Sequence, residues 1–131
     1  MNSNPMLLLV GRLLLAAIFI VSGLWKITHF AGSAGYLGKV GLPAAEAMAV
    51  LAIVIELGGG LLVAVGWKTR LAAWLLAIFT VAATLLGHRF WEADPAQYFN
   101  QMNHFLKNLA IIGGFLALAA AGPGRLSVDK G

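Results

Sequence analysis

The stretch that decides the fold is LAAWLLAIFTVAATLL, residues 71–86. It carries no charged residue, and only Thr80 and Thr84 interrupt its otherwise apolar run. A helix of this composition is apolar on every side, whereas a helix in a soluble bundle needs one polar face. A second stretch, residues 109–121 (LAIIGGFLALAAA), has the same character. The sequence therefore predicts helices that lie in a lipid bilayer.

The composition of the whole chain supports the same conclusion. Of its 131 residues, 60% are hydrophobic and 11% are charged, whereas a soluble domain carries about 25% charged residues. The mean hydropathy is +0.87. The net charge is +4, but the cations are scattered between apolar segments and form no basic face, which argues against nucleic acid as a partner. Cysteine is absent, so a disulfide, a thiolate metal site and a cysteine nucleophile are excluded.

Four membrane-spanning segments can be drawn, each close to the roughly 20 residues that cross the hydrocarbon core of a bilayer. They are residues 5–28, 44–66, 70–87 and 102–121. We therefore expect an all-α membrane protein, with four transmembrane helices in an antiparallel bundle and one domain over residues 1–131. Asp94 and Pro95 have the form of a helix start, so the fourth helix can begin before the membrane, near Pro95.

The basic residues of the loops indicate the orientation of the chain. One side carries Lys68 and Arg70 together with Arg125 and Lys130, and the other carries only Lys39 and Arg89. Basic residues are enriched on the cytoplasmic side of membrane proteins. Both termini are therefore expected in the cytoplasm.

Five charged residues lie inside or at the edge of the apolar segments: Arg12, Lys26, Glu46, Glu56 and Lys107. A charge in hydrocarbon costs about 2.5 to 3.5 kcal/mol on insertion scales, so such groups are usually paired and often mark function. Depth can be estimated at about 1.5 Å of rise per residue. On that scale Arg12 is expected to meet Glu56, and Lys26 is expected to meet Glu46.

Two interpretations of these charges remain open. In the first they form a polar cluster, joined by His104, Lys107 and Asn108, around a pocket that binds an amphipathic ligand or relays a proton. In the second they are internal ion pairs that fix the register of the helices, while lysines near the helix ends extend to the membrane surface. The histidines fall at helix ends beside aromatic residues, which does not suit a haem or metal centre, so no metal site is expected.

Residues along nearly the whole chain form an ordered pattern that resembles the DoxX family of small four-helix membrane proteins. The pattern consists of Arg12, Phe19, Ser22, Gly23, Lys26, Glu56, Leu57, Gly58, Gly59, Gly66, Arg70, Gly87, His88, Phe90, Trp91, Asn103, Phe105, Lys107, Asn108, Leu109 and the tail from Gly122 to Asp129. Its Gly-His-aromatic-Trp and Lys-Asn-Leu pieces are similar to the enterobacterial inner-membrane branch of that family.

The resemblance implies a multi-pass protein of the bacterial inner (plasma) membrane. The family takes its name from a membrane subunit associated with quinone-linked sulfur oxidation. Other members are linked to membrane redox complexes, oxidative-stress defence and the detoxification of catechols or quinones. The positions that the motif carries over are Arg12, Lys26, Glu56, Arg70, His88, Lys107 and Asn108, whereas Glu46 and His104 rest on the depth argument alone.

The residues present restrict the function. The chain carries no self-sufficient catalytic motif and no intrinsic cofactor, so we expect at most a subunit of a quinone-linked oxidoreductase. Lys, His and Glu side chains can donate to a quinone carbonyl and deliver protons. The first hypothesis is a protein that binds a quinone-like or other lipophilic molecule, or a lipid, in a membrane redox or detoxification system with an oxidoreductase partner.

The alternative hypothesis is a non-catalytic accessory or anchoring subunit for a partner oxidoreductase. In that case the intramembrane charges only stabilise the bundle. The sequence leaves open the identity of the ligand, the partner proteins and the oligomeric state, including a homo-oligomer. It also leaves open whether the charged cluster is a binding site or a set of structural ion pairs.

Overall fold

The computed structural model describes residues 4–131, and within that range it contains helices and no β-strand. The elements, in chain order, are α1 (Pro5–Thr28), α2 (Phe30–Lys39), α3 (Ala45–Ile53), the π-helix η1 (Val54–Gly58), α4 (Gly59–Val65), α5 (Thr69–Gly87), the 3-10 helix η2 (Phe90–Glu92) and α6 (Pro95–Ala121). Four helical segments are long and apolar enough to cross a membrane. The prediction of an all-α membrane protein with four spans is confirmed.

The observed spans agree closely with those drawn from the sequence. The second span is made of α3, η1 and α4, which follow one another without a break. Helix α6 begins at Pro95, so the helix start predicted from the Asp94–Pro95 motif, ahead of the span drawn from residue 102, is confirmed. Helix α2 was missed by the sequence analysis, because it is only ten residues long and three of those residues are glycine, which lowers helix propensity by about 1 kcal/mol each.

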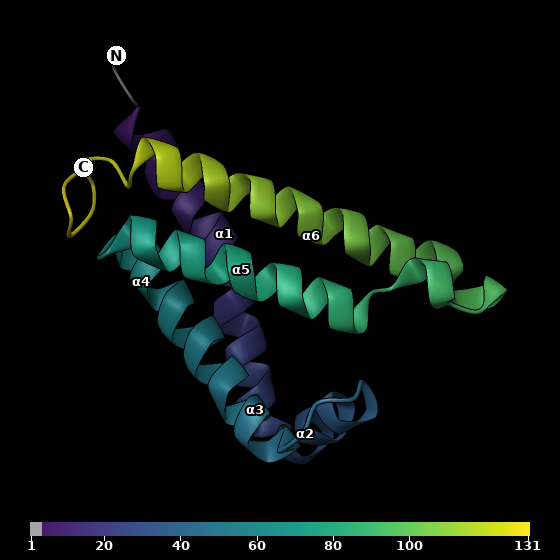
Figure 1. Ribbon diagram of the computed structural model, residues 1–131. Coiled ribbons are helices and arrows are strands. Elements are labelled where there is room, and N and C mark those ends of the chain that lie inside the picture. The colour runs from purple at the N-terminus through teal and green to yellow at the C-terminus, as the bar shows by residue number, and fades with distance from the viewer. Residues whose placement is uncertain (1–3) are drawn as a thin grey trace.

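The helices form two antiparallel pairs that meet near the chain termini. Figure 1 shows α5 and α6 side by side, while α3 and α4 run away from them toward α2, with α1 alongside. The start of α1 and the C-terminus lie at the end where the two pairs meet. The far ends of the pairs diverge, and this divergence leaves room for the cavity described below.

The core lies between all four spans, at the end where the two helix pairs meet, which we call the closed end. Phe19 of α1 and Phe115 of α6 pack with their ring centroids 5.4 Å apart, and Val63, Leu76 and Leu118 surround them. Aromatic pairs at this separation contribute about 0.5 to 1.5 kcal/mol beyond the burial of their surface. This packing fixes how α1, α4, α5 and α6 sit against one another.

Glycines allow the helix backbones to approach closely, which is how helices associate in lipid. A Cβ atom added to Gly59 would lie 3.0 Å from the side chain of Leu76 on α5, and one added to Gly60 would lie 3.0 Å from Ile20 on α1. On α1, Gly23 lies against the backbone of Leu57. These contacts set the register of the second span against its neighbours, and so they position Glu56.

Candidate functional site

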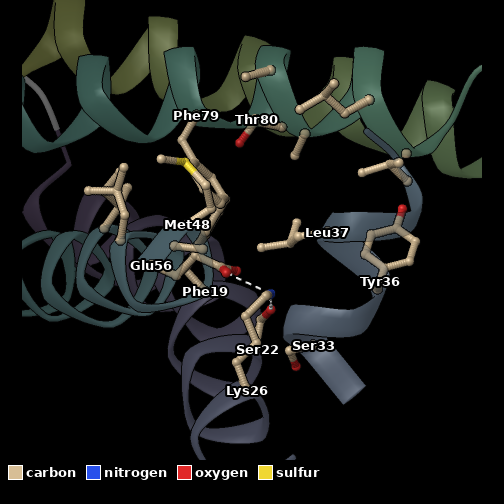
Figure 2. A pocket seen from close by; sticks show the side chains of 18 of the residues that line it. Phe19, Ser22, Lys26, Ser33, Tyr36, Leu37, Met48, Glu56, Phe79 and Thr80 are labelled. Atoms are coloured by element: carbon tan, nitrogen blue, oxygen red, sulfur yellow. Dashed lines mark hydrogen bonds and ion pairs between the residues drawn. The ribbon is translucent and has the colours of Figure 1, made fainter. Parts of the chain in front are cut away.

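A cavity of about 880 Å³ lies between the two diverging helix pairs. Side chains from α1, α2, α3, η1, α5 and α6 line it, and most of them are apolar. Its charged side chains are Lys26 and Glu56, and Figure 2 shows these two side chains in contact as an ion pair. Polar atoms are added by Ser22 of α1, Tyr36 of α2 and Thr80 of α5. The cavity is therefore mostly apolar, with an ion pair on the wall formed by α1 and η1.

Lys26 and Glu56 form an ion pair, with Nζ 2.6 Å from Oε1. Glu56 is buried, with only 4% of its surface exposed. Its Oε1 atom has no hydrogen-bond partner in the described part of the chain apart from this ion pair. Lys26 also donates a hydrogen bond to Ser22 Oγ at 2.8 Å. Depth predicted Glu46 as the partner of Lys26 and Arg12 as the partner of Glu56, so the predicted pairing is wrong for both residues.

The π-helix η1 aims the Glu56 side chain. A π-helix is a rare single-turn widening that occurs frequently at functional sites, because one inserted residue turns a side chain out of the regular helical register. Glu56 is the third residue of Val54–Gly58. It lies ten residues before Gly66, about 15 Å along the axis, which is near the middle of a hydrocarbon core of about 30 Å. Glu56 therefore lies near the middle of the second span, Ala45–Val65.

Glu46, which was expected to pair with Lys26, is exposed at the first turn of α3 and forms no ion pair with the described residues. The cause is the register of α1. Because Gly23 lies against Leu57, Lys26 falls beside the turn that contains Glu56.

Arg12 is buried, with 1% of its surface exposed, but it does not contact Glu56. Its guanidinium donates hydrogen bonds to four carbonyl oxygens: those of Val63 (3.1 Å) and Ala64 (3.2 Å) at the end of α4, and those of Pro123 and Leu126 (2.9 Å) in the C-terminal tail. The last carbonyls of a helix have no partner within the helix. Arg12 therefore ties α1 to the end of α4 and to the tail.

The tail, residues 122–131, is held by a second set of bonds that the sequence analysis did not foresee. The Asp129 carboxylate accepts hydrogen bonds from the Lys68 backbone N–H (2.9 Å), the Thr69 backbone N–H (2.9 Å) and the Thr69 hydroxyl (2.8 Å). These bonds, the Thr69 backbone N–H first, lower the pKa of Asp129 below its usual value. Asp129 therefore caps the first turn of α5, although it lies 60 residues away in the chain.

Gly66 is required at the turn where the tail docks. Its φ of 73° lies in the left-handed region, which favours glycine. A side chain there would also collide with Ser127 of the tail. The Gly66 carbonyl accepts a hydrogen bond from the Asp129 backbone N–H at 2.8 Å. A glycine at this position thus permits both the turn and the docking.

The remaining sequence-predicted residues lie on α5, α6 and the loop between them. Asn108 is buried, lines the cavity and donates to Thr84 Oγ1 at 2.9 Å. His88 lines the cavity and its ring stacks on that of His104, with centroids 4.9 Å apart. Lys107 is exposed on α6 and lies 3.4 Å from the Nδ1 atom of His104. The cation expected at the level of Lys26 is therefore turned away from the ion pair.

The seven side chains of the expected polar cluster do not form one group. Lys26, Glu56 and Asn108 line the cavity, whereas Arg12 lies at the closed end. Glu46 is exposed at the start of α3. His104 and Lys107 belong to α6, where the His104 ring stacks on that of His88 and Lys107 lies next to His104. Among the described residues, no group of three or more His, Cys, Asp or Glu side chains could hold a metal ion.

Comparison with known proteins decides the family. A family model described as DoxX matches residues 7–89. The chain belongs to the DoxX family. This DoxX protein is 34% identical over 128 residues to Inner membrane protein YphA of Escherichia coli (strain K12), which covers 98% of this chain and 91% of the relative. It is 41% identical over 122 residues to Inner membrane protein YqjF of the same organism, covering 93% of this chain and 88% of the relative.

A more distant relative is an uncharacterized membrane protein of Mycobacterium tuberculosis (strain ATCC 25618 / H37Rv). It is 32% identical over 126 residues, which cover 91% of this chain and 77% of that protein. No solved structure matches the chain.

In this DoxX protein the motif residues divide between the two ends of the bundle. Lys26, Glu56, His88 and Asn108 line the cavity. At the closed end, Arg70 of α5 donates to the Ala119 carbonyl of α6 at 3.0 Å, and Arg12 binds the tail. Arg12 and Arg70 bond to backbone carbonyls at the closed end, while the cavity residues present polar atoms to a partly open space between the helix pairs.

Proposed function

We propose that this DoxX protein binds a quinone-like or other lipophilic small molecule in the cavity. It does so in the inner membrane of a bacterium, with both termini in the cytoplasm, as part of a membrane redox or detoxification system. The observation that carries the proposal is the Lys26–Glu56 ion pair, which lines a mostly apolar cavity between membrane-spanning helices. An ionisable pair inside a membrane protein is a functional-site candidate when it faces a cavity.

The size and lining of the cavity suit such a ligand. Small-molecule sites have volumes of about 300 to 1,000 Å³ and are mostly apolar, with a few polar groups that fix the orientation of the ligand. The cavity volume of about 880 Å³ lies within that range. It has room for an aromatic headgroup and the first part of an apolar tail. The apolar wall would hold the tail, and the polar wall would select the headgroup.

Lys26 supplies the main polar contact to the headgroup. An ammonium has three donors, of which one points to Ser22 and one to Glu56. The third donor serves a ligand carbonyl or phenolic oxygen. Glu56 keeps the Lys26 charge balanced when the cavity holds no anion. The site therefore favours a neutral headgroup with an oxygen acceptor, as in a quinone.

The protein brings no electrons of its own in this proposal. Any redox change of the ligand is carried out by an oxidoreductase partner, and the cavity binds and orients the molecule. The bound quinone or lipid is thus an exchangeable ligand rather than a built-in cofactor.

A binding measurement in nanodiscs tests the proposal. Decylubiquinone is added to the purified protein, and the quenching of tryptophan fluorescence is followed, since Trp25 lines the cavity. The test variant is the double substitution Lys26→Met with Glu56→Leu, because replacing both partners of a buried ion pair by apolar residues is often neutral for stability. The control is Lys39→Met, an exposed lysine of α2.

We expect the double variant to bind decylubiquinone about 10- to 100-fold more weakly, the value of one hydrogen bond to a charged group. The Lys39 control should match the wild type. A wild-type protein that binds no decylubiquinone beyond the amount in an empty nanodisc would refute the proposal. So would a double variant with unchanged affinity.

One observation favours the second candidate, an accessory or anchoring subunit. The exposed aromatic side chains of Trp91, Tyr98 and Phe99 gather on η2 and the first turns of α6. Aromatic residues are enriched in protein–protein interfaces, although they also form belts at the membrane surface. Native mass spectrometry of the protein extracted gently from its own membrane separates the two candidates. A bound small molecule supports the first, and a copurified oxidoreductase with an empty cavity supports the second.

A further inference from the structure

A gap separates α3 and α5, two of the helices that line the cavity. In the described chain, no Cα atom of α3 lies within 8 Å of a Cα atom of α5. Helix α3 packs on α1 and α2, whereas α5 packs on α4 and α6, and Figure 1 shows the two helices diverging from the closed end. Helix backbone therefore does not close the cavity along this gap.

The side chains at the gap are apolar. Four of them line the cavity and are also exposed at the surface of the protein: Leu51 of α3 and Leu75, Ile78 and Ala82 of α5. A side chain with both properties lies at an opening, so we call these four residues the rim. Leu75 and Ala82 lie on the face of α5 opposite Thr84, which is hydrogen-bonded to α6. The opening is therefore on the side of α5 that faces away from α6.

The rim belongs to the membrane-spanning part of the protein. Leu51 lies in the span Ala45–Val65, and the rim residues of α5 lie in the span Thr69–Glu92. Exposed apolar side chains of a membrane-spanning helix contact lipid, and a contiguous group of them marks a membrane contact or a ligand groove. The gap therefore opens sideways into the bilayer.

Helix α2 covers the end of the cavity that lies away from the closed end. Ser33, Tyr36 and Leu37 of α2 line the cavity, and Figure 2 shows Tyr36 reaching from α2 toward the opposite helix. The Tyr36 hydroxyl packs so closely on Gly87, at the end of α5, that there is no room for a Cβ atom at that position. This contact connects the two helix pairs at their far ends. The route that it leaves for a ligand is the gap between α3 and α5.

The ion pair and the rim share one wall of the cavity. Leu51 precedes Glu56 by five residues in one continuous helical span, which is about 7 Å along the axis. Ala52 and Ile55, between them, also line the cavity. The wall thus changes from charged at Glu56 to apolar at Leu51 over a short distance, as a ligand with a polar head and an apolar chain requires.

We propose that the gap between α3 and α5 is a lateral portal, in which the apolar chain of the ligand lies across the rim while its headgroup contacts Lys26. The inference rests on the proposed function and names the class of ligand: an amphiphile that resides in the membrane, with a small polar headgroup and one flexible apolar chain. The cavity holds the headgroup and the first part of the chain, and the rest of the chain stays in the bilayer. The rim residues select for the chain.

Two ligands and a set of phenylalanine substitutions test the portal. The ligands are decylubiquinone and its methyl analogue, which has the same ring with a methyl group in place of the decyl chain. The test variants are Ala82→Phe, alone and together with Leu51→Phe. The matched control is Val81→Phe, because Val81 is the adjacent residue of α5 and is exposed, but is not among the residues that line the cavity. The variant Ile18→Phe adds bulk at an exposed cavity residue of α1.

Affinities are measured in nanodiscs by the quenching of Trp25, and the substitutions add no tryptophan. We expect Ala82→Phe to bind decylubiquinone about tenfold more weakly than the wild type, because the added ring crowds the chain in the gap. Adding Leu51→Phe should weaken binding further. The methyl analogue should stay within about twofold of its wild-type affinity in both variants, since it has no chain to place in the gap. Val81→Phe and Ile18→Phe should match the wild type for both ligands.

A monodisperse size-exclusion profile shows that each variant is folded, and Ala82→Leu replaces Ala82→Phe if the latter is not. The outcomes separate this inference from the proposed function. A wild type that binds neither ligand refutes both. A wild type that binds decylubiquinone, with unchanged affinity in the rim variants, overturns the portal alone. Equal weakening of both ligands, or weakening of decylubiquinone by Ile18→Phe and not by Ala82→Phe, also overturns it. Selective weakening of decylubiquinone in the rim variants supports the portal.

Discussion

Arg12→Met should release the C-terminal tail and destabilise the bundle, although Arg12 lies in a helix and far from the tail in the chain. Its guanidinium is the donor for four backbone carbonyls, two at the end of α4 and two in the tail. Methionine fills a similar volume and is apolar, so it removes all four donors while causing little loss of packing. The four carbonyls are then left in a region with little access to water.

The magnitude follows from the number of acceptors. Each carbonyl that loses its donor in a buried site costs about 1 kcal/mol or more. Four acceptors give a loss of about 4 kcal/mol, which agrees with the roughly 3 to 5 kcal/mol for breaking one side of a buried polar network. For a chain of this length, about 4 kcal/mol corresponds to a fall of about 15 °C in melting temperature. Arg12→Lys keeps the charge but has fewer donors, so it should lose about half as much.

Two measurements test the reasoning. The melting temperature is followed by size-exclusion chromatography with fluorescence detection, and release of the tail is followed by the rate at which trypsin cuts after Arg125. Docked backbone resists proteolysis until it opens locally. The control Arg125→Met removes an exposed cation of the same tail and should leave the melting temperature unchanged. An Arg12→Met protein that melts within about 2 °C of the wild type, with its tail cut at the wild-type rate, would show that these bonds do not hold the bundle.

Two further predictions concern single carboxylates. Glu56→Gln leaves the Lys26 ammonium without a counter-charge between the membrane-spanning helices and should cost about 3 to 5 kcal/mol; adding Lys26→Met should recover most of the lost melting temperature, and an equally unstable double variant would contradict the pairing. Asp129→Asn removes a carboxylate whose pKa is lowered by its bonds to Thr69 and Lys68. The stabilising effect of the carboxylate is therefore full above the ordinary pKa of 3.8 and is lost as the pH falls through the lower folded pKa. The difference in melting temperature between wild type and variant should shrink as the pH falls below 3.8. A difference that is constant from about pH 6 to pH 3 would contradict this prediction.

The helices could be predicted from the sequence because the signals for them are local. Apolar length defines a span, and a residue such as Pro95 or Gly122 marks where a helix begins or ends. The pairing of charges could not be predicted, because depth places a residue along a helix axis and says nothing about its rotation. The π-helix at Glu56 changes that rotation, and the contact of Gly23 with Leu57 fixes the register.

Nothing in the sequence indicates which groups Arg12 bonds to. Its partners are backbone carbonyls, which every residue carries, so no partner residue type could be searched for. Asp129 belongs to the tail that carries the family resemblance, but its target is a pair of backbone N–H groups at the start of α5. Side-chain chemistry can be inferred from a sequence, whereas contacts of side chains with distant backbone need coordinates.

The contacts with the tail and the cavity lie at opposite ends of this bundle, and two basic residues of α1 therefore have different surroundings. Arg12 makes its bonds with backbone, all at the end where the four spans converge, and it has no contact with the cavity. Lys26 bonds only with side chains, Ser22 and Glu56, at the end where the helix pairs diverge. A residue whose partners are backbone carbonyls resists motion of the helices, because those carbonyls cannot turn away. A residue whose partners are side chains can exchange one of them for a ligand oxygen. For that reason Arg12 substitutions should lower the melting temperature without changing the affinity of the folded protein for decylubiquinone, and the double substitution at Lys26 and Glu56 should do the reverse.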